Sequence, residues 1–152
     1  MQDLERIVAL EEIRRLKATY CHALDAKDWT LFETIFTEDG AADMREAGPA
    51  GAPGMVLIEG RPAMMAYVKE AVKAWRTIHH VYSPLITFTD QDEATGVWQM
   101  DDRLLIPDGD GWALVLQGYG HYHETYVKRG GRWLIHRVKL TRHHVEYGPG
   151  AG

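Results

Sequence analysis

The chain has 152 residues, 45% of them hydrophobic and 26% charged, a composition typical of one globular domain with a buried core. Its formal net charge of −5 argues against nucleic acid and anionic membranes as partners, because no basic excess is available to neutralise phosphates. The single cysteine, Cys21, excludes an intrachain disulfide, and neither a signal peptide nor an apolar membrane span is visible. We therefore expect a single domain over residues 1–152 and a cytoplasmic location.

Helical periodicity dominates the first part of the chain. Apolar residues recur at intervals of three or four over residues 4–24, which predicts an amphipathic helix with Asp3 as its N-cap. A shorter helix is predicted from Trp29 to Phe36, with Asp28 as its cap, before the turn-forming sequence TEDG.

A loop and a third helix come next. Residues 45–54, REAGPAGAPG, are rich in glycine and proline, so we expect a loop at the surface or over a pocket. Residues 61–75 predict a third helix, with Pro62 near its first turn, where an amide proton is not needed. All the predicted helices thus precede the predicted sheet.

The hydrophobic period changes to two in the rest of the chain, which predicts long strands over residues 79–90, 94–106, 112–128 and 132–146. The connecting sequences PDGDG and KRGGR are typical of tight turns, so the last three strands should form an antiparallel meander. Helices followed by long antiparallel strands indicate the α+β class. We expect a long, curved, mainly antiparallel sheet with the N-terminal helices against its concave face, enclosing a cone with a ligand-sized mouth.

Three stretches of the chain resemble the SnoaL-like family of the nuclear transport factor 2-like superfamily. They are EEIRRLKATYCHALDAKDWTLFETIFTEDG (11–40), TIHHVYSPLITF (77–88) and GYGHYHETYVKRGGRWLIHRVKL (118–140). The resemblance covers nearly the whole chain and implies the cone-shaped α+β barrel of that family. Family members include dehydratases, a dehydrochlorinase, ketosteroid isomerase, polyketide cyclases and noncatalytic proteins, so function has to be argued from the site.

Asp25 and His79 are the main candidate catalytic residues. Catalytic members of the family share an aspartate at the end of the first helix and a histidine that opens the strand after the third helix; YCHALDAKDW and TIHH supply both. The resemblance implies that His79 is a general base, since imidazole titrates near neutrality, and that Asp25 orients it. A solvated aspartate and a solvent-facing histidine are the alternatives. Because strand residues alternate, His80 should lie on the outer face or in a subunit contact.

Tyr20 and the last strand supply further candidates. The dehydratases of the family have a tyrosine five residues before the aspartate, a spacing that Tyr20 matches, although a plain core tyrosine is equally compatible. Strand alternation puts Arg137, Lys139 and Thr141 on one face of the last strand, together with Trp133. In the dehydrochlorinase the arginine four residues after the matching tryptophan faces the cavity. The resemblance therefore implies that Arg137 binds an anionic group, with a structural ion pair as the alternative, and that Lys139 is a second candidate acid or base.

Other residues are expected to line the cavity. Met100 and Asp102 share one face of the second long strand, Tyr122 and Glu124 share one face of the third, and the family alignment turns both faces inward. The second histidine of scytalone dehydratases would fall near Met100 or Asp102, so that part of their machinery is missing. Further apolar wall residues, for which a core position is the alternative, are Trp29, Met44, Met64, Met65 and Tyr67.

We expect neither a metal nor a cofactor. The sequence has no HExxH, CxxC, GxGxxG or P-loop motif. His121 and His123 share a face, but strand alternation makes it the outer one.

These features predict a cofactor-independent lyase that acts on a small hydrophobic, aromatic or polycyclic molecule. His79, held by Asp25, would remove a proton while water, a halide or, in a deformylating elimination, formaldehyde leaves; Tyr20, Arg137 or Lys139 would stabilise the negative charge. A ketosteroid-type isomerase or a polyketide cyclase would use the same residues.

The alternative from another class is noncatalytic: a ligand-binding domain or the small subunit of a dioxygenase. The coincidence of Asp25 and His79 at the catalytic positions of the family counts against it, because such a role needs neither. We expect a homo-oligomer, either a trimer or a dimer. The outer-face residues suited to a subunit contact are Tyr82, Tyr119, His121 and His123.

Overall fold

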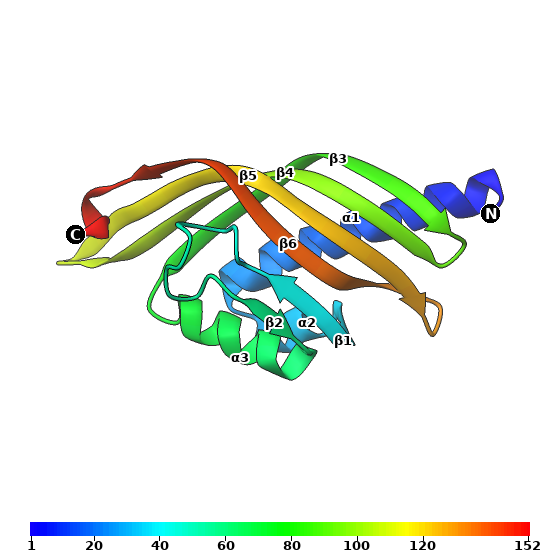
Figure 1. Cartoon of the computed structure of the whole chain (residues 1–152), viewed down its shortest axis with the longest axis horizontal. Helices are drawn as coiled ribbons and strands as arrows, with labels where there is room; N and C mark the ends of the chain where they lie inside the picture. Colours follow the sequence, from blue (N-terminus) through cyan, green and yellow to red (C-terminus); the bar gives the residue numbers. More distant parts are fainter.

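Three helices pack against one six-stranded sheet in the computed structural model, which describes all 152 residues (Figure 1). The elements in chain order are α1 (Asp3–Ala26), α2 (Trp29–Glu33), β1 (Phe36–Asp43), β2 (Leu57–Glu59), α3 (Arg61–Val72), β3 (Arg76–Asp90), β4 (Glu93–Asp108), β5 (Gly111–Arg129), β6 (Arg132–Tyr147) and the 3-10 helix η1 (Pro149–Ala151). The predicted α+β class is confirmed. None of the helices combines the length and the apolar character that crossing a membrane requires.

The sheet is mixed and open, with the strand order β2-β1-β6-β5-β4-β3. Strands β3 to β6 are antiparallel neighbours, which confirms the predicted meander. Gly130 and Gly131 join β5 to β6 with φ of 58° and 75°, the left-handed backbone that a two-residue hairpin turn needs. The sequence pattern predicts neither β1, which pairs in parallel with β6, nor β2. The β1 sequence FTEDGAAD lacks a period of two, and the strand with which it pairs lies far along the chain. Because β1 begins at Phe36, the second helix ends at Glu33 and not at Phe36 as predicted.

The helix caps match the sequence analysis only for α2. Asp28 caps this helix by accepting a hydrogen bond from the backbone N–H of Leu31 at 3.1 Å. The N-cap prediction for α1 is wrong, because Asp3 is already helical and Gln2 is the cap. Glu5 accepts the Gln2 N–H at 2.9 Å, which lets a capping box form one residue earlier.

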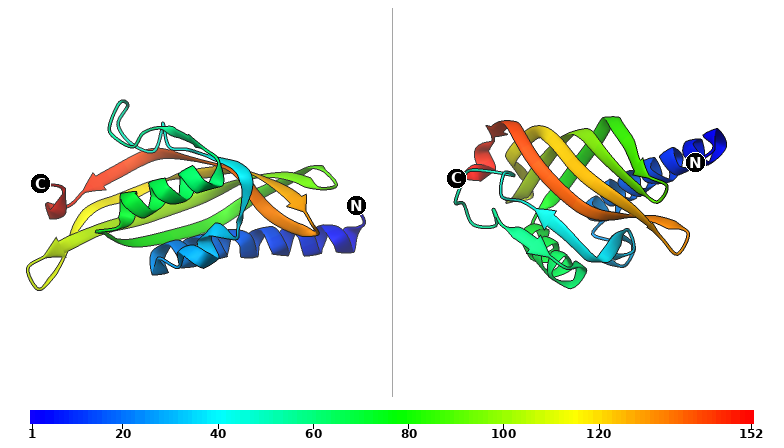
Figure 2. Two further views of the ribbon diagram at one scale, coloured as in Figure 1. Left: turned by 90° about the horizontal axis from the view of Figure 1, so that it is seen from below. Right: turned by 45° about the vertical axis from the view of Figure 1, so that its right-hand side comes forward.

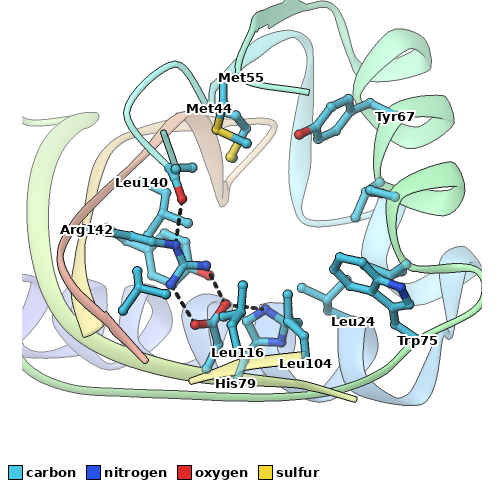
Figure 3. A pocket seen from close by; sticks show the side chains of 18 of the residues that line it. Leu24, Met44, Met55, Tyr67, Trp75, His79, Leu104, Leu116, Leu140 and Arg142 are labelled. Carbon is cyan, nitrogen blue, oxygen red and sulfur yellow. Dashed lines mark hydrogen bonds and ion pairs between the residues drawn. The ribbon is translucent and has the colours of Figure 1, made fainter. Parts of the chain in front are cut away.

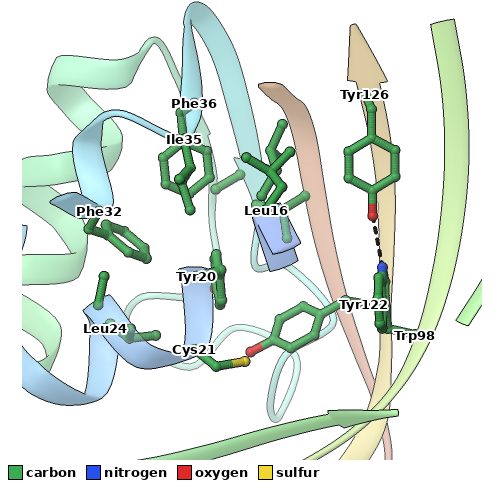
Figure 4. Packing of buried hydrophobic residues seen from close by; sticks show 14 of the residues in the cluster. Leu16, Tyr20, Cys21, Leu24, Phe32, Ile35, Phe36, Trp98, Tyr122 and Tyr126 are labelled. Atoms are coloured by element: carbon green, nitrogen blue, oxygen red, sulfur yellow. Dashed lines mark hydrogen bonds between the residues drawn. The ribbon is translucent and has the colours of Figure 1, made fainter. Parts of the chain in front are cut away.

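The helices cover the concave side of the sheet, with α1 against β3 and β6, and α3 against β1 and β2 (Figure 2). An aromatic cluster fills the space between α1, α2 and β1 (Figure 4). The ring of Phe32 lies 5.2 Å from that of Tyr20 and 5.0 Å from that of Phe36, centroid to centroid. Such tilted contacts add to the burial of apolar area and fix α1 against the rest of the core.

A β-bulge in β6 decides which of its side chains face the helices. Tyr126 pairs with Ile135, whereas the preceding residue of β5, Thr125, pairs with Arg137, so His136 is an extra residue. An extra residue reverses the alternation of inward and outward side chains beyond it. The strict alternation assumed from the sequence therefore fails after Ile135.

The expectation that Arg137, Lys139 and Thr141 face the cavity is wrong for this reason. They lie on the outer side of the sheet, and the residues of β6 that turn toward the helices are Val138, Leu140 and Arg142. A second register shift leaves His143 as another extra residue, because Gly120 pairs with Arg142 and Tyr119 with His144. The alternation reverses again, and Val145 and Tyr147 turn inward.

One ion pair is completely buried in the core. The side chains of Lys17 and Glu124 form it, and both are 0% exposed. Glu124 also accepts a hydrogen bond from the Tyr126 hydroxyl. The Trp98 indole N–H donates to the same hydroxyl at 2.8 Å (Figure 4). Glu124 therefore belongs to this buried network. The expectation that it lines the cavity is wrong.

Candidate active site

A mostly apolar cavity of about 260 Å³ lies between the sheet, α1, α3 and the loop that joins β1 to β2 (Figure 3). Sixteen of its 21 lining residues are hydrophobic, so the cavity suits a small apolar molecule better than a highly charged one. Its apolar walls include Leu24, Met44, Met55, Tyr67, Trp75, Leu104 and Leu116.

Asp25 and His79 meet at the wall of this cavity. Asp25 lies in the last turn of α1 and His79 near the start of β3. Nδ1 of His79 is 2.7 Å from Oδ1 of Asp25, and the backbone N–H of His79 donates to Oδ2 at 2.8 Å. The Thr77 hydroxyl also donates to Oδ1, at 2.9 Å. Three donors thus fix the orientation of the carboxylate, which in turn fixes the imidazole ring.

These contacts decide which nitrogen of His79 carries the proton. An ionised carboxylate only accepts hydrogen bonds, so Nδ1 of His79 donates its proton to Asp25. Nε2 of the neutral ring then keeps a free lone pair and faces the cavity beside Asp102 (Figure 3). The side chain of His79 is only 8% exposed, so bulk water has little access to it. A shielded imidazole with one free acceptor nitrogen is the arrangement that a general base requires.

Asp102 and Arg142 form an ion pair next to His79. Two hydrogen bonds of 2.7 Å join the Arg142 guanidinium to the Asp102 carboxylate, and Oδ2 of Asp102 lies 4.0 Å from Nε2 of His79 (Figure 3). Burial acts to lower the pKa of Arg142, but the hydrogen bonds and the charge attraction to Asp102, with a contribution from Tyr122 and Tyr147, together raise that pKa above its usual value. Arg142 is therefore a permanent cation, and Asp102 is a fixed carboxylate close to the position where an imidazolium would form.

Arg142 also fastens the roof of the cavity. Its Nε donates to the backbone carbonyl of Ala47 at 2.7 Å. On the opposite side, the Tyr67 hydroxyl donates to the carbonyl of Gly54 at 2.8 Å. The turn-rich residues 45–54 thus cover the pocket, which resolves the two possibilities left open by the sequence.

The structure brings six of the candidate site residues to the cavity: Tyr20, Met44, Tyr67, His79, Asp102 and Tyr122. Asp25 reaches it through His79. Met64, Met65 and Met100 are buried in the core, and Trp29 packs edge-on against Phe32 with ring centroids 5.9 Å apart. The expectation that these four residues line the cavity is wrong. These residues do face the interior, but they contact other core side chains and not the cavity.

The outward residues of β6 have partners of their own. Lys139 forms an ion pair with Glu46, and Thr141 forms a hydrogen bond with His123 at 3.0 Å. Arg137 is exposed to solvent. These contacts lie on the opposite side of the sheet from His79, so none of the three side chains reaches the cavity.

Sequence reasoning missed Thr77 and Arg142. Thr77 stands two residues before His79 on the same face of β3, and strand alternation would have placed it beside Asp25. No local signal identifies Arg142, because the β-bulge at His136 controls its direction. Lys17 was also missed, although a lysine within the apolar stripe of a helix is a visible exception to the pattern.

Gly118→Ala is expected to disrupt the roof of the cavity. A Cβ at Gly118 would lie 1.9 Å from Nη1 of Arg142 and 2.7 Å from Oδ1 of Asp102, so the guanidinium would have to leave. Such a steric clash in a packed site costs about 1–3 kcal/mol, which denaturant-induced unfolding would measure. Gly111→Ala is the matched control, since the nearest atom to its Cβ is 3.8 Å away. Equal stability of the two variants would contradict the close approach.

The polar groups of the site are thus one imidazole held by a carboxylate, one buried ion pair and four tyrosine hydroxyls around an apolar cavity. No three His, Cys, Asp or Glu side chains converge closely enough to hold a metal ion. The arrangement is suited to moving a proton to or from a small apolar ligand.

Comparison with known families agrees with this architecture. The sequence model of the SnoaL-like domain matches residues 5–139. The chain belongs to the SnoaL-like family. The chain is also similar to FGR4 of Gibberella zeae, which is described as a cyclase by inference. It is 25% identical over 138 residues, which are 86% of this chain and 88% of the relative.

Solved structures share the SnoaL-like fold seen here. A type 2 hexachlorocyclohexane dehydrochlorinase superposes with a TM-score of 0.80 at 15% identity, covering 96% of this chain and 93% of that chain. A Novosphingobium aromaticivorans protein with an inferred assignment as a scytalone dehydratase gives a TM-score of 0.79 at 22% identity, covering 96% and 91%. At these identities the two structures establish the fold alone. Together with the family match, they confirm the resemblance noted from the sequence.

Proposed function

We propose that this protein is a cofactor-independent lyase of small, mainly apolar, ring-containing molecules, with His79 as its general base. The observation that carries the proposal is the free Nε2 of His79 inside an apolar cavity, with Nδ1 bound to Asp25 at 2.7 Å. Binding an apolar ligand would need only the walls, whereas the oriented base adds the ability to remove a proton.

The proposed reaction is an elimination. Nε2 of His79 takes a proton from a carbon of the substrate, and the electron pair of that C–H bond becomes the new C=C bond. The leaving group departs from the neighbouring carbon with its own bonding pair. If hydroxide leaves, the imidazolium returns the proton to it and water is released; if a halide leaves, the proton passes to solvent. Asp25 and Asp102 stabilise the imidazolium in the interval.

The similarities support an enzyme over a noncatalytic ligand-binding domain or a dioxygenase small subunit. The related structures are described as a dehydrochlorinase and, by inference, a scytalone dehydratase, and both names denote eliminations. A binding domain or a small subunit requires neither Asp25 nor the free nitrogen of His79.

A cyclase is the second candidate, favoured by the similarity to FGR4. The first step would be the same proton removal by His79. The resulting carbanion would then attack a carbonyl carbon of the same molecule, and the proton of the imidazolium would go to the new alkoxide. Assembly as a homo-oligomer and a cytoplasmic location stay predictions for either activity.

The proton transfer is testable without knowledge of the natural substrate. 2-Indanone is a small ring ketone with acidic C–H bonds, and NMR in deuterium oxide follows the exchange of these hydrogens. We expect the protein to accelerate the exchange above the buffer rate. A parallel screen of cyclic β-hydroxy ketones, alkyl halides and aromatic diols would identify the leaving group. Tight binding of such molecules without exchange or turnover would favour the noncatalytic alternative.

A further inference from the structure

Tyr20 and Tyr122 form an unusual part of the cavity wall. They are only 6% and 2% exposed, and their rings meet edge to face with centroids 5.5 Å apart. Outside this pair, neither hydroxyl has a hydrogen-bond partner in the protein. Two nearly buried phenols thus line the cavity that His79 faces, and their hydroxyls have no hydrogen-bond partner except each other.

The ammonium group of Lys17 lies against both of these rings. Its Nζ is 3.6 Å from the ring centroid of Tyr20 and 3.6 Å from that of Tyr122. Glu124 binds the ammonium group, and the Tyr126 hydroxyl binds Glu124 in turn. The cation is therefore held in one place, with two aromatic faces turned toward it and no exposure to bulk solvent.

We propose that Lys17 is a positioning residue that polarises Tyr20 and Tyr122, so that their hydroxyls bind the oxyanion of an enolate or phenolate in the cavity. The proposal deepens the proposed function and rests on it, because proton removal by His79 next to a carbonyl creates such an oxyanion. A cation over an aromatic face attracts its π electrons, which makes the phenolic O–H a better hydrogen-bond donor. Water exclusion strengthens this effect.

The protonation state of the tyrosines agrees with a donor role. Burial, together with the nearby Glu124 carboxylate, raises the pKa of Tyr20, and burial raises the pKa of Tyr122 well above its usual value. Both hydroxyls therefore keep their protons at neutral pH and can donate them to an anion. Preorganised donors of this kind stabilise charge that develops during a reaction.

Binding of 4-nitrophenol tests the inference, because its absorbance reports the ionisation of the bound molecule. 4-Nitrotoluene, of similar shape but without the hydroxyl, is the neutral comparison ligand. In Lys17→Met/Glu124→Gln, which removes both buried charges together, we expect the affinity for 4-nitrophenolate to fall about tenfold, equivalent to one pKa unit of the bound probe. The affinity for 4-nitrotoluene should stay unchanged. Glu124→Gln alone retains Lys17 and should bind the anion at least as tightly as the wild type.

A purely structural role for Lys17 would give another pattern. Both ligands would then weaken together in the double variant, or neither would, and either result overturns the proposal. Tyr20→Phe should weaken 4-nitrophenolate binding in the wild type but have little further effect in the double variant; equal losses in the two backgrounds would also overturn it. Because phenolate binding involves no proton transfer by His79, a failure here is separable from an absence of 2-indanone exchange.

One measurement needs no substitution. In wild-type protein labelled with 15N-lysine, the Nζ protons of Lys17 should exchange slowly and be shifted upfield by the two aromatic rings. Protons at the ordinary position of a solvent-exposed lysine would contradict the geometry on which the proposal depends.

Discussion

His79→Ala is expected to lower the rate of base-catalysed exchange of 2-indanone, and kcat/KM for any elimination substrate, by about 10²–10⁴-fold. The variant removes the nitrogen that faces the cavity while the apolar walls remain. Ligand binding, measured with 4-nitrotoluene, should therefore change far less than the rate. This difference between rate and affinity distinguishes a lost base from a damaged pocket.

His80→Ala is the matched control for this experiment. His80 is the adjacent residue on the same strand, but its side chain is 54% exposed and pairs with Asp101 on the outer face. We expect it to retain activity close to that of the wild type. Asp25→Asn should lose activity in the same direction as His79→Ala, because an amide cannot accept from all three donors that now hold the carboxylate. Full activity of His79→Ala would rule out His79 as the base.

Lys17→Met is expected to lower the free energy of unfolding by about 3–5 kcal/mol. The substitution approximately conserves volume, but it leaves the Glu124 carboxylate buried with no cation beside it. A domain of this size has a total stability of roughly 5–15 kcal/mol, so the variant should be marginally folded. Urea-induced unfolding followed by circular dichroism would measure the change.

Two further variants distinguish the effect of an unpaired buried charge on stability from the effect of losing any lysine. Lys73→Met removes a lysine whose ion pair with Glu70 is mostly exposed, with side chains 65% and 73% accessible, and should change stability by less than about 0.5 kcal/mol. Lys17→Met/Glu124→Gln should recover most of the loss, because no unpaired charge remains in the core. A Lys17→Met protein as stable as the wild type would be incompatible with a buried ion pair.

Local sequence patterns predict those features of the fold that depend on neighbouring residues. The three-to-four spacing of apolar residues in α1 and the alternation in β3 to β6 reflect burial of one face of each element, and both are visible in the chain itself. The turn at Gly130 and Gly131 is equally local, since it needs two residues with positive φ. By contrast, β1 depends on pairing with β6 and carries no pattern of its own.

The candidate site divides in the same way. Family resemblance singled out Asp25 and His79, and the tertiary structure places them in contact at 2.7 Å, although their catalytic roles stay a proposal. The family resemblance pointed to Arg137, but Arg142 reaches the cavity instead, because one extra residue at His136 reverses the side-chain directions from there to the second bulge at His143.

The amino-acid sequence by itself determined the helices, the long strands, the meander and the family to which the chain belongs. Those properties arise from interactions among residues close in the chain and from patterns that the whole family shares. Only the tertiary structure decided that Arg142 reaches the cavity, that residues 45–54 cover it, and that Lys17 lies buried between two tyrosine rings. Each of these depends on register and on contacts between distant segments, and no local pattern encodes them.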